Sequence, residues 1–141
     1  MYESIKGIGE HVPEEVEWIG SWANLVKKLI SLNKEGKMAG NLLTDYDPDD
    51  EYDIKLRLGE VREKVVDAFG AKTVLRWGHN SEEKPYTQRS VDTIFVELNP
   101  DFLYPTKLSQ LRGLMYLSQV GDEVELIKTR KNRYILIFWW D

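Results

Sequence analysis

Residues that could perform acid–base chemistry are gathered in one polar stretch of this 141-residue chain, at positions 78–92. His79 titrates near neutral pH and could act as a general base, while Arg89 could hold an anionic group. Tyr86 and Asp92 add a hydroxyl and a carboxylate. The spacing of these four candidate catalytic residues matches no triad and no metal motif. Two interpretations stay open, a small enzyme that uses this loop and a solvated loop without a catalytic role.

Basic residues suggest a second kind of chemistry, the binding of phosphate groups. They surround two predicted hairpins, and if the hairpins are neighbours they form a basic stripe with an aromatic ring among them. Such a stripe could follow a nucleic-acid backbone and stack on bases. The alternative is that Lys and Arg protect strand edges from aggregation. The candidate nucleic-acid-binding residues are Arg76, Trp77, Arg89, Lys128, Arg130, Lys131 and Arg133.

Two observations argue against metal and thiol chemistry. The chain contains no cysteine, which excludes thiol catalysis and thiolate metal sites. The acidic run at 45–53 offers oxygen ligands, but it lacks the spacing and the glycine of a calcium-binding loop. We therefore expect neither a metal nor a cofactor, and we interpret this run as the solvated start of a helix.

The charge is distributed unevenly along the chain, whose net charge is -5. Residues 1–70 contain 9 Lys and Arg against 15 Asp and Glu, whereas residues 71–141 contain 10 against 9. The abundance of charge with few glutamines is typical of thermophile proteins. No apolar run is long enough for a membrane span, and the start lacks the features of a signal peptide. We expect a cytoplasmic protein that does not bind membranes.

The first 70 residues show helical patterns. A stripe of Trp18, Trp22, Leu25, Leu29 and Leu32 predicts one helix from Pro13 to about Gly36. A second helix begins after Asp47, a suitable N-cap, and ends at Gly70. We interpret Trp18 and Trp22 as core residues, and the alternative is that their rings form a surface on which a ligand stacks.

The remaining residues predict four strands and one helix. β-branched and aromatic residues favour strands at 73–77 and 91–98, and alternation favours a strand at 123–128. The stretch 134–140 is apolar throughout, which indicates a strand that is covered on both faces. A helix capped by Thr106 lies between the hairpins, and its predicted apolar side consists of Leu108, Leu111, Leu114, Met115 and Leu117.

These elements predict a single α+β domain over 1–141, with an arm at 1–12, an acidic helical half at 13–70 and a sheet-forming half at 71–141. Two N-terminal helices precede a β-β-α-β-β unit. Its four-stranded sheet is mostly antiparallel, with the C-terminal strand central and covered on both faces. We expect a protein that acts by binding, with nucleic acid as the first candidate partner. The alternatives are an enzyme that uses residues 78–89, a protein partner, and a homo-oligomer.

Overall fold

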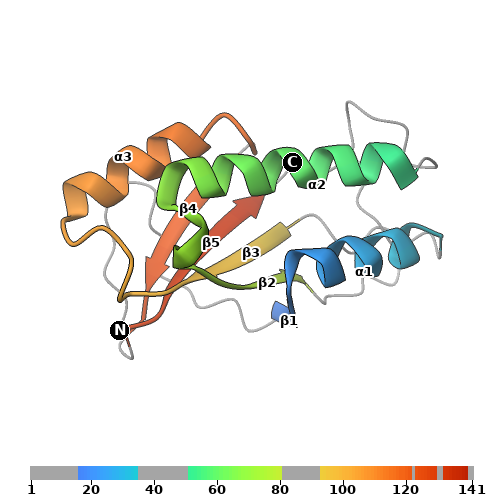
Figure 1. Ribbon diagram of the computed structural model, residues 1–141, viewed down its shortest axis with the longest axis horizontal. Coiled ribbons are helices and arrows are strands. Elements are labelled where there is room, and N and C mark those ends of the chain that lie inside the picture. The colour runs from blue at the N-terminus through green and yellow to red at the C-terminus, as the bar shows by residue number, and fades with distance from the viewer. Residues whose placement is uncertain (1–15, 35–50, 81–92, 122, 130–131, 140–141) are drawn as a thin grey trace.

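The computed structural model describes residues 16–34, 51–80, 93–121, 123–129 and 132–139. In these ranges three helices lie beside one five-stranded antiparallel sheet (Figure 1). The α+β class and the antiparallel sheet are confirmed. The strands are β1 (Val16–Gly20), β2 (Val74–Asn80), β3 (Thr93–Leu98), β4 (Glu123–Lys128) and β5 (Tyr134–Trp139). The helices are α1 (Trp22–Lys34), α2 (Glu51–Phe69) and α3 (Lys107–Leu117), with a short 3-10 turn η2 (Ala71–Thr73) after α2.

The strand order is β1-β2-β3-β5-β4. This order corrects two predictions, since the sheet has a fifth strand and β3, not the C-terminal strand, is central. β5 is nevertheless an internal strand, paired with β3 on one side and β4 on the other. The two hairpins are therefore neighbours, as the basic-stripe hypothesis required.

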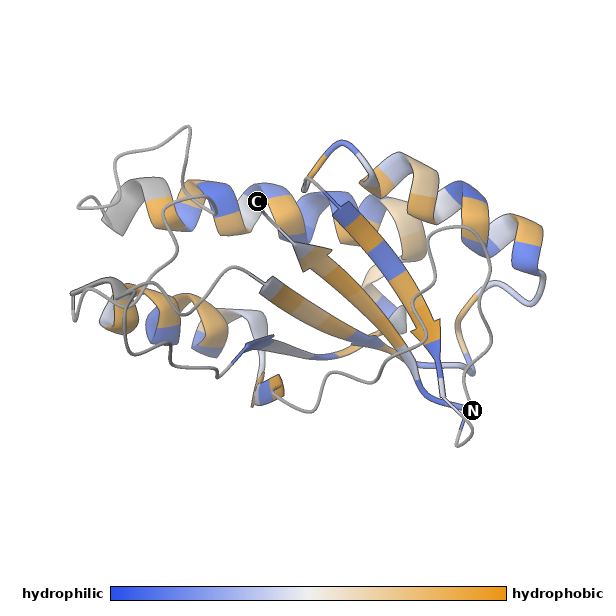
Figure 2. Cartoon of the chain, turned by 180° about the vertical axis from the view of Figure 1, so that it is seen from behind, coloured by the Kyte–Doolittle hydropathy of each residue, from blue (hydrophilic) through white to orange (hydrophobic). Residues whose placement is uncertain are grey.

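The helices lie on one face of the sheet (Figures 1 and 2). Residues opposite each other in an antiparallel ladder lie on the same face of the sheet. The pairing register therefore shows on which face each side chain lies. Ile94 and Phe138 face the helices and are fully buried, and Leu25 and Leu58 belong to the same core. The central strand is buried along its entire length.

β5 buries side chains on both faces, as its apolar sequence predicted. Leu136 lies on the helix side and Ile135 on the other, and both are buried. Ile137 is only half-buried, so it is not the fully buried core residue that an unbroken apolar run indicates. β4 alternates between hydrophobic and hydrophilic residues, whereas β3 and β5 are mostly hydrophobic (Figure 2).

β1 replaces the first part of the predicted N-terminal helix. The 16–20 segment pairs with β2. Its last residue, Gly20, has a φ of 99°, a backbone conformation that ends the strand and that a helix cannot contain. Ser21 then caps α1, because its Oγ accepts a hydrogen bond from the Asn24 N–H at 3.2 Å. The prediction of one continuous helix from Pro13 is therefore wrong in the part that the structure describes.

The other helix ends agree with the sequence. Gly70 terminates α2 with a φ of 93°, and Thr106 caps α3 by accepting a hydrogen bond from Ser109 N–H at 3.1 Å. The predicted N-cap of the second helix, Asp47, lies outside the described residues. In the described ranges, none of the helices combines the length and the apolarity that a membrane crossing would need.

Candidate functional site

His79 lies inside β2 and not in the loop where the sequence placed it. The strand continues through Gly78 and Asn80, with β1 on one side and β3 on the other. Gly78 permits this close pairing, because a Cβ there would meet the Glu17 carbonyl oxygen at 2.8 Å. The other three candidate catalytic residues, Tyr86, Arg89 and Asp92, lie outside the described residues. A catalytic role for the four residues stays a prediction.

The His79 imidazole is buried on the helix side of the sheet. Its Nδ1–H donates to the Asn80 carbonyl oxygen at 2.6 Å, and its Nε2 lies 3.4 Å from Glu17 Oε2. Glu17 also approaches Lys28 of α1, at 3.8 Å. Burial lowers the pKa of His79, and this effect outweighs the opposing influences of Asn80 and Glu17. His79 is thus a neutral core histidine near pH 7.

Arg76 and Arg133 meet at one carboxylate, that of Glu97. Arg76 Nε lies 2.6 Å from Glu97 Oε1, and Arg133 donates to both oxygens at 2.9 and 3.0 Å. A β-bulge at Leu75 places Arg76 directly opposite Glu97 in the ladder. The Glu97 side chain is only 10% exposed, whereas each arginine side chain is 37% exposed. The structure therefore joins two of the candidate nucleic-acid-binding residues, one from each hairpin.

The Arg76 guanidinium also lies 4.2 Å above the centre of the Trp18 ring. Trp18 packs edge-on against Phe95 with a ring separation of 6.4 Å, so the aromatic surface under Arg76 is fixed by the sheet. The sequence did not reveal this partner, because the spacing of Trp18 from Trp22 predicts a helix. Only the register of β1 on β2 brings Trp18 and Arg76 together.

The remaining candidate nucleic-acid-binding residues have other positions. Trp77 is 4% exposed and points to the helices, so its ring cannot stack on a base in this structure. Lys128 lies over the Tyr134 ring at 5.7 Å. Arg89, Arg130 and Lys131 are outside the described residues.

The exposed apolar surface of the described chain is concentrated on α3 and the loop before it. Among the residues that the structure describes, seven large apolar side chains are exposed, and five of them lie between positions 102 and 116: Phe102, Tyr104, Leu108, Met115 and Tyr116. The predicted apolar side of this helix is divided in the structure, since Leu108 and Met115 are 60% and 63% exposed whereas Leu114 and Leu117 are buried. The buried side of α3 consists of Gln110, Gly113, Leu114 and Leu117. Apolar residues occur around most of the circumference of α3, and this pattern in the sequence indicates that the helix has a second apolar side.

We use the name α3 face for the surface formed by Leu108, Leu111, Arg112, Met115 and Tyr116. Residues three and four apart are neighbours on a helix, so Arg112 lies between Leu108, Met115 and Tyr116. Arg112 forms no hydrogen bond or ion pair with any residue that the structure describes. An exposed guanidinium thus occupies the middle of an apolar surface.

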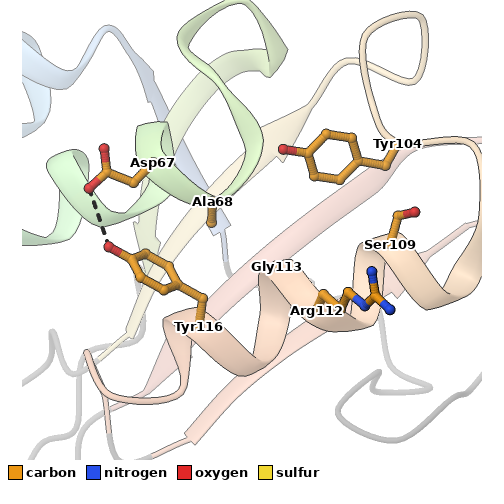
Figure 3. A pocket seen from close by; sticks show the side chains of 7 residues that line it. All are labelled: Asp67, Ala68, Tyr104, Ser109, Arg112, Gly113 and Tyr116. Atoms are coloured by element: carbon orange, nitrogen blue, oxygen red, sulfur yellow. Dashed lines mark hydrogen bonds between the residues drawn. The ribbon is translucent and has the colours of Figure 1, made fainter.

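A hollow of about 360 Å³ opens between α2 and α3, at the edge of the α3 face that Arg112 and Tyr116 form (Figure 3). Ala68 and Gly113 lie between the side chains of Tyr104 and Tyr116 in this view. Tyr116 Oη donates to Asp67 Oδ2 at 3.3 Å and accepts from Lys64 Nζ at 3.4 Å, which ties α3 to α2. The lining consists of Asp67, Ala68, Tyr104, Ser109, Arg112, Gly113 and Tyr116.

The loop before α3 is held by hydrogen bonds to its neighbours. Gln110 is buried and donates from Nε2 to the Tyr104 carbonyl oxygen at 2.8 Å. Asn99 accepts from Asp101 N–H at 3.0 Å, and its own N–H donates to the Thr73 carbonyl oxygen at 2.6 Å. The Tyr104 ring lies 5.9 Å from that of Phe69. The aromatic side of the hollow is therefore positioned by the fold before any ligand arrives.

The residues described contain no group of three or more histidine, aspartate or glutamate side chains that could hold a metal ion. Comparison of the whole chain with protein-family models, with curated proteins and with solved structures gives no match.

Proposed function

We propose that this protein is a recognition module that binds an acidic, amphipathic segment of a partner protein through the α3 face. The observation that carries the proposal is the concentration of exposed apolar side chains between positions 102 and 116. Contiguous apolar surface costs solvation free energy in an isolated soluble domain, and such patches mark interaction sites.

The composition of the α3 face indicates the chemistry of the partner. Tyrosine and arginine are enriched among the residues that contribute most binding free energy in interfaces, and here Arg112 lies beside Tyr116. α3 contains two cations, Lys107 and Arg112, and neither aspartate nor glutamate. A partner that covers the apolar side chains must therefore also supply a carboxylate for Arg112, since burying an unpaired guanidinium is costly.

A second copy of this chain fits the surface less well. In a symmetric dimer the same patch meets itself, so two α3 faces would bring Arg112 against Arg112 across the axis. Like charges placed together in a desolvated interface repel each other. Asp67, the acidic residue that lines the hollow, already accepts a hydrogen bond from Tyr116.

The hollow gives the partner a place for one anchoring side chain. Its volume of about 360 Å³ lies at the low end of the range for ligand sites. The two tyrosine side chains provide aromatic walls, and Ala68 and Gly113 add no long side chain between them. An aliphatic or aromatic side chain of the partner would enter here while its neighbouring carboxylate reaches Arg112.

The test uses three synthetic amphipathic peptides that share their apolar positions and carry Glu, Gln or Lys at the polar positions. At peptide concentrations of about 1 mM, which detect binding free energies of about −4 kcal/mol, the Glu peptide should shift the amide resonances of residues 104–117 in ¹⁵N-labelled protein. Met115→Ser should weaken this binding. Leu75→Ser is the matched control, because Leu75 is also half-exposed but lies on β2, and it should bind like the parent.

Arg112→Glu tests the charge of the partner directly. This change should reverse the preference, so that the Lys peptide binds better than the Glu peptide. The proposal fails if no peptide shifts resonances on α3, or if Leu75→Ser loses binding as Met115→Ser does. A parent protein that dimerises in sedimentation experiments, with Met115→Ser remaining monomeric, would identify the occupant as a second copy and overturn the proposed partner.

A further inference from the structure

The cluster of Arg76, Glu97 and Arg133 carries more positive charge than its carboxylate can compensate. Burial raises the pKa of Glu97, but hydrogen bonds from Arg133 and Arg76 outweigh burial and keep that pKa below its ordinary value. Glu97 is therefore ionised at neutral pH. Two guanidinium groups against one carboxylate leave a local charge of about +1.

Glu97 does not use every N–H group of the two guanidinium groups in this cluster. Arg76 uses Nε for Glu97, and Arg133 uses Nε and Nη2. The N–H groups on both Nη atoms of Arg76 and on Nη1 of Arg133 have no acceptor among the residues that the structure describes. A single arginine in bidentate geometry would have satisfied Glu97, so the second guanidinium adds donors and charge beyond what the carboxylate needs.

Both arginines are held in position before a ligand binds. Arg76 is fixed by Glu97 on one side and by the Trp18 ring on the other. Arg133 follows the β4–β5 turn, where its N–H donates to Thr129 Oγ1 at 3.2 Å and its carbonyl oxygen accepts from Thr129 N–H at 2.9 Å. Preorganised donors lose little conformational entropy when an anion arrives.

We infer that Arg76 and Arg133, oriented by Glu97, form a binding site for a phosphate-type oxyanion. The tetrahedral oxygens of a phosphate group accept hydrogen bonds from two guanidinium edges, which a chloride ion cannot match in geometry. The phosphate belongs either to a small molecule or to a nucleic-acid backbone, and the chemistry of the site is the same for both. The site lies on the sheet and does not depend on the α3 face.

The experiment follows the arginine Nε–Hε resonances of the folded parent protein during titration with inorganic phosphate. The resonances of Arg76 and Arg133 should shift and saturate, while sodium chloride at equal ionic strength should not produce saturation. The Nε–Hε resonance of Arg62 is the internal control, because Arg62 also lies over a tryptophan ring, that of Trp22 at 5.2 Å. Equal, unsaturated shifts with phosphate and chloride would mean ionic screening alone and would overturn the site.

A second arm separates the two sources of phosphate. Labelled single- and double-stranded oligonucleotides are titrated at about 50 mM salt, and a binder that contacts phosphates loses affinity as salt rises. Oligonucleotide binding that Arg76→Gln weakens and Arg62→Gln leaves intact would assign the site to a nucleic-acid backbone. Saturation by phosphate without oligonucleotide binding would assign it to a small phosphorylated ligand. The parent titrations decide the result even if Arg76→Gln fails to fold, and the absence of both responses would overturn the inference.

Discussion

Gly113 of α3 lies so close to Phe69 of α2 that a Cβ at position 113 would stand 2.7 Å from Cζ of the phenylalanine ring. A side chain at this position would therefore have to displace the ring. The Phe69 ring in turn contacts the Tyr104 ring, so one small residue determines how α3 approaches α2 and how the hollow is formed.

Replacing Gly113 by alanine should therefore destabilise the protein, by about 1–3 kcal/mol as is typical of overpacked cores. Gly59 is the matched control, because it lies in α2 and a Cβ added there would meet no heavy atom within 4 Å. Gly59→Ala should stabilise the protein by roughly 0.5–1 kcal/mol through helix propensity alone. Urea denaturation measures both variants. Similar effects of the two changes would contradict the close packing of α3 on Phe69.

Glu97 should make stability depend on pH in the acidic range. Its folded pKa is lower than its ordinary value of about 4.3, so the unfolded chain takes up the proton first. The contribution of Glu97 to the free energy of unfolding is then complete above about pH 4.3, and it is lost as the pH falls through the pKa of the folded state. The difference in unfolding free energy between the parent and Glu97→Gln should shrink from pH 6 to about pH 3. A constant difference over this range would be incompatible with an ionised Glu97 held by two arginines.

His79 should remain neutral at pH values where an exposed histidine begins to ionise. Burial lowers its folded pKa, so the unfolded chain binds the proton first and stability falls as the pH drops below about 6.5. NMR of the imidazole nitrogens should show the Nδ1–H tautomer, since the Asn80 carbonyl oxygen can only accept. His79→Gln identifies the resonance. A titration midpoint at or above about 6.5 would show that Glu17 outweighs burial.

Strands β2 to β5 and the helix ends at Gly70 and Thr106 were predictable because local chemistry determines them. Thr106 accepts a backbone hydrogen bond and Gly70 adopts a positive φ, and both requirements are visible in the residue types. The apolar run of β5 likewise indicated burial on both faces. The position of β5 in the sheet was not predictable, because strand order depends on pairing between segments distant in sequence.

The errors at β1 and α3 have physical causes as well. Trp18 and Trp22 are four residues apart, a helical spacing, but Gly20 lies between them with a φ of 99° and separates a strand from a helix. α3 has apolar residues on two sides, and only Gly113 marks the side that packs closely, because its missing side chain admits Phe69. The meeting of Arg76, Glu97 and Arg133 depended on the bulge at Leu75 and on the β3–β5 pairing, neither of which leaves a pattern in the sequence.

β5 provides a comparison between two isoleucines on one face of one strand. Ile135 and Ile137 are two residues apart and therefore point to the same side, away from the helices, but Ile135 is 1% exposed and Ile137 is half-buried. Ile135→Ala should cost about 2–5 kcal/mol, the range for buried isoleucines. Ile137→Ala should cost clearly less, because it removes less buried apolar area. Leu136→Ala, on the helix side, should resemble Ile135→Ala.

Denaturation midpoints of these three variants test whether β5 is covered on both faces. Equal costs for Ile135→Ala and Ile137→Ala would mean that the two positions are buried alike. A cost below about 1 kcal/mol for Ile135→Ala, together with a large cost for Leu136→Ala, would mean that only the helix side of β5 contributes to the core, because truncating an exposed side chain changes stability little.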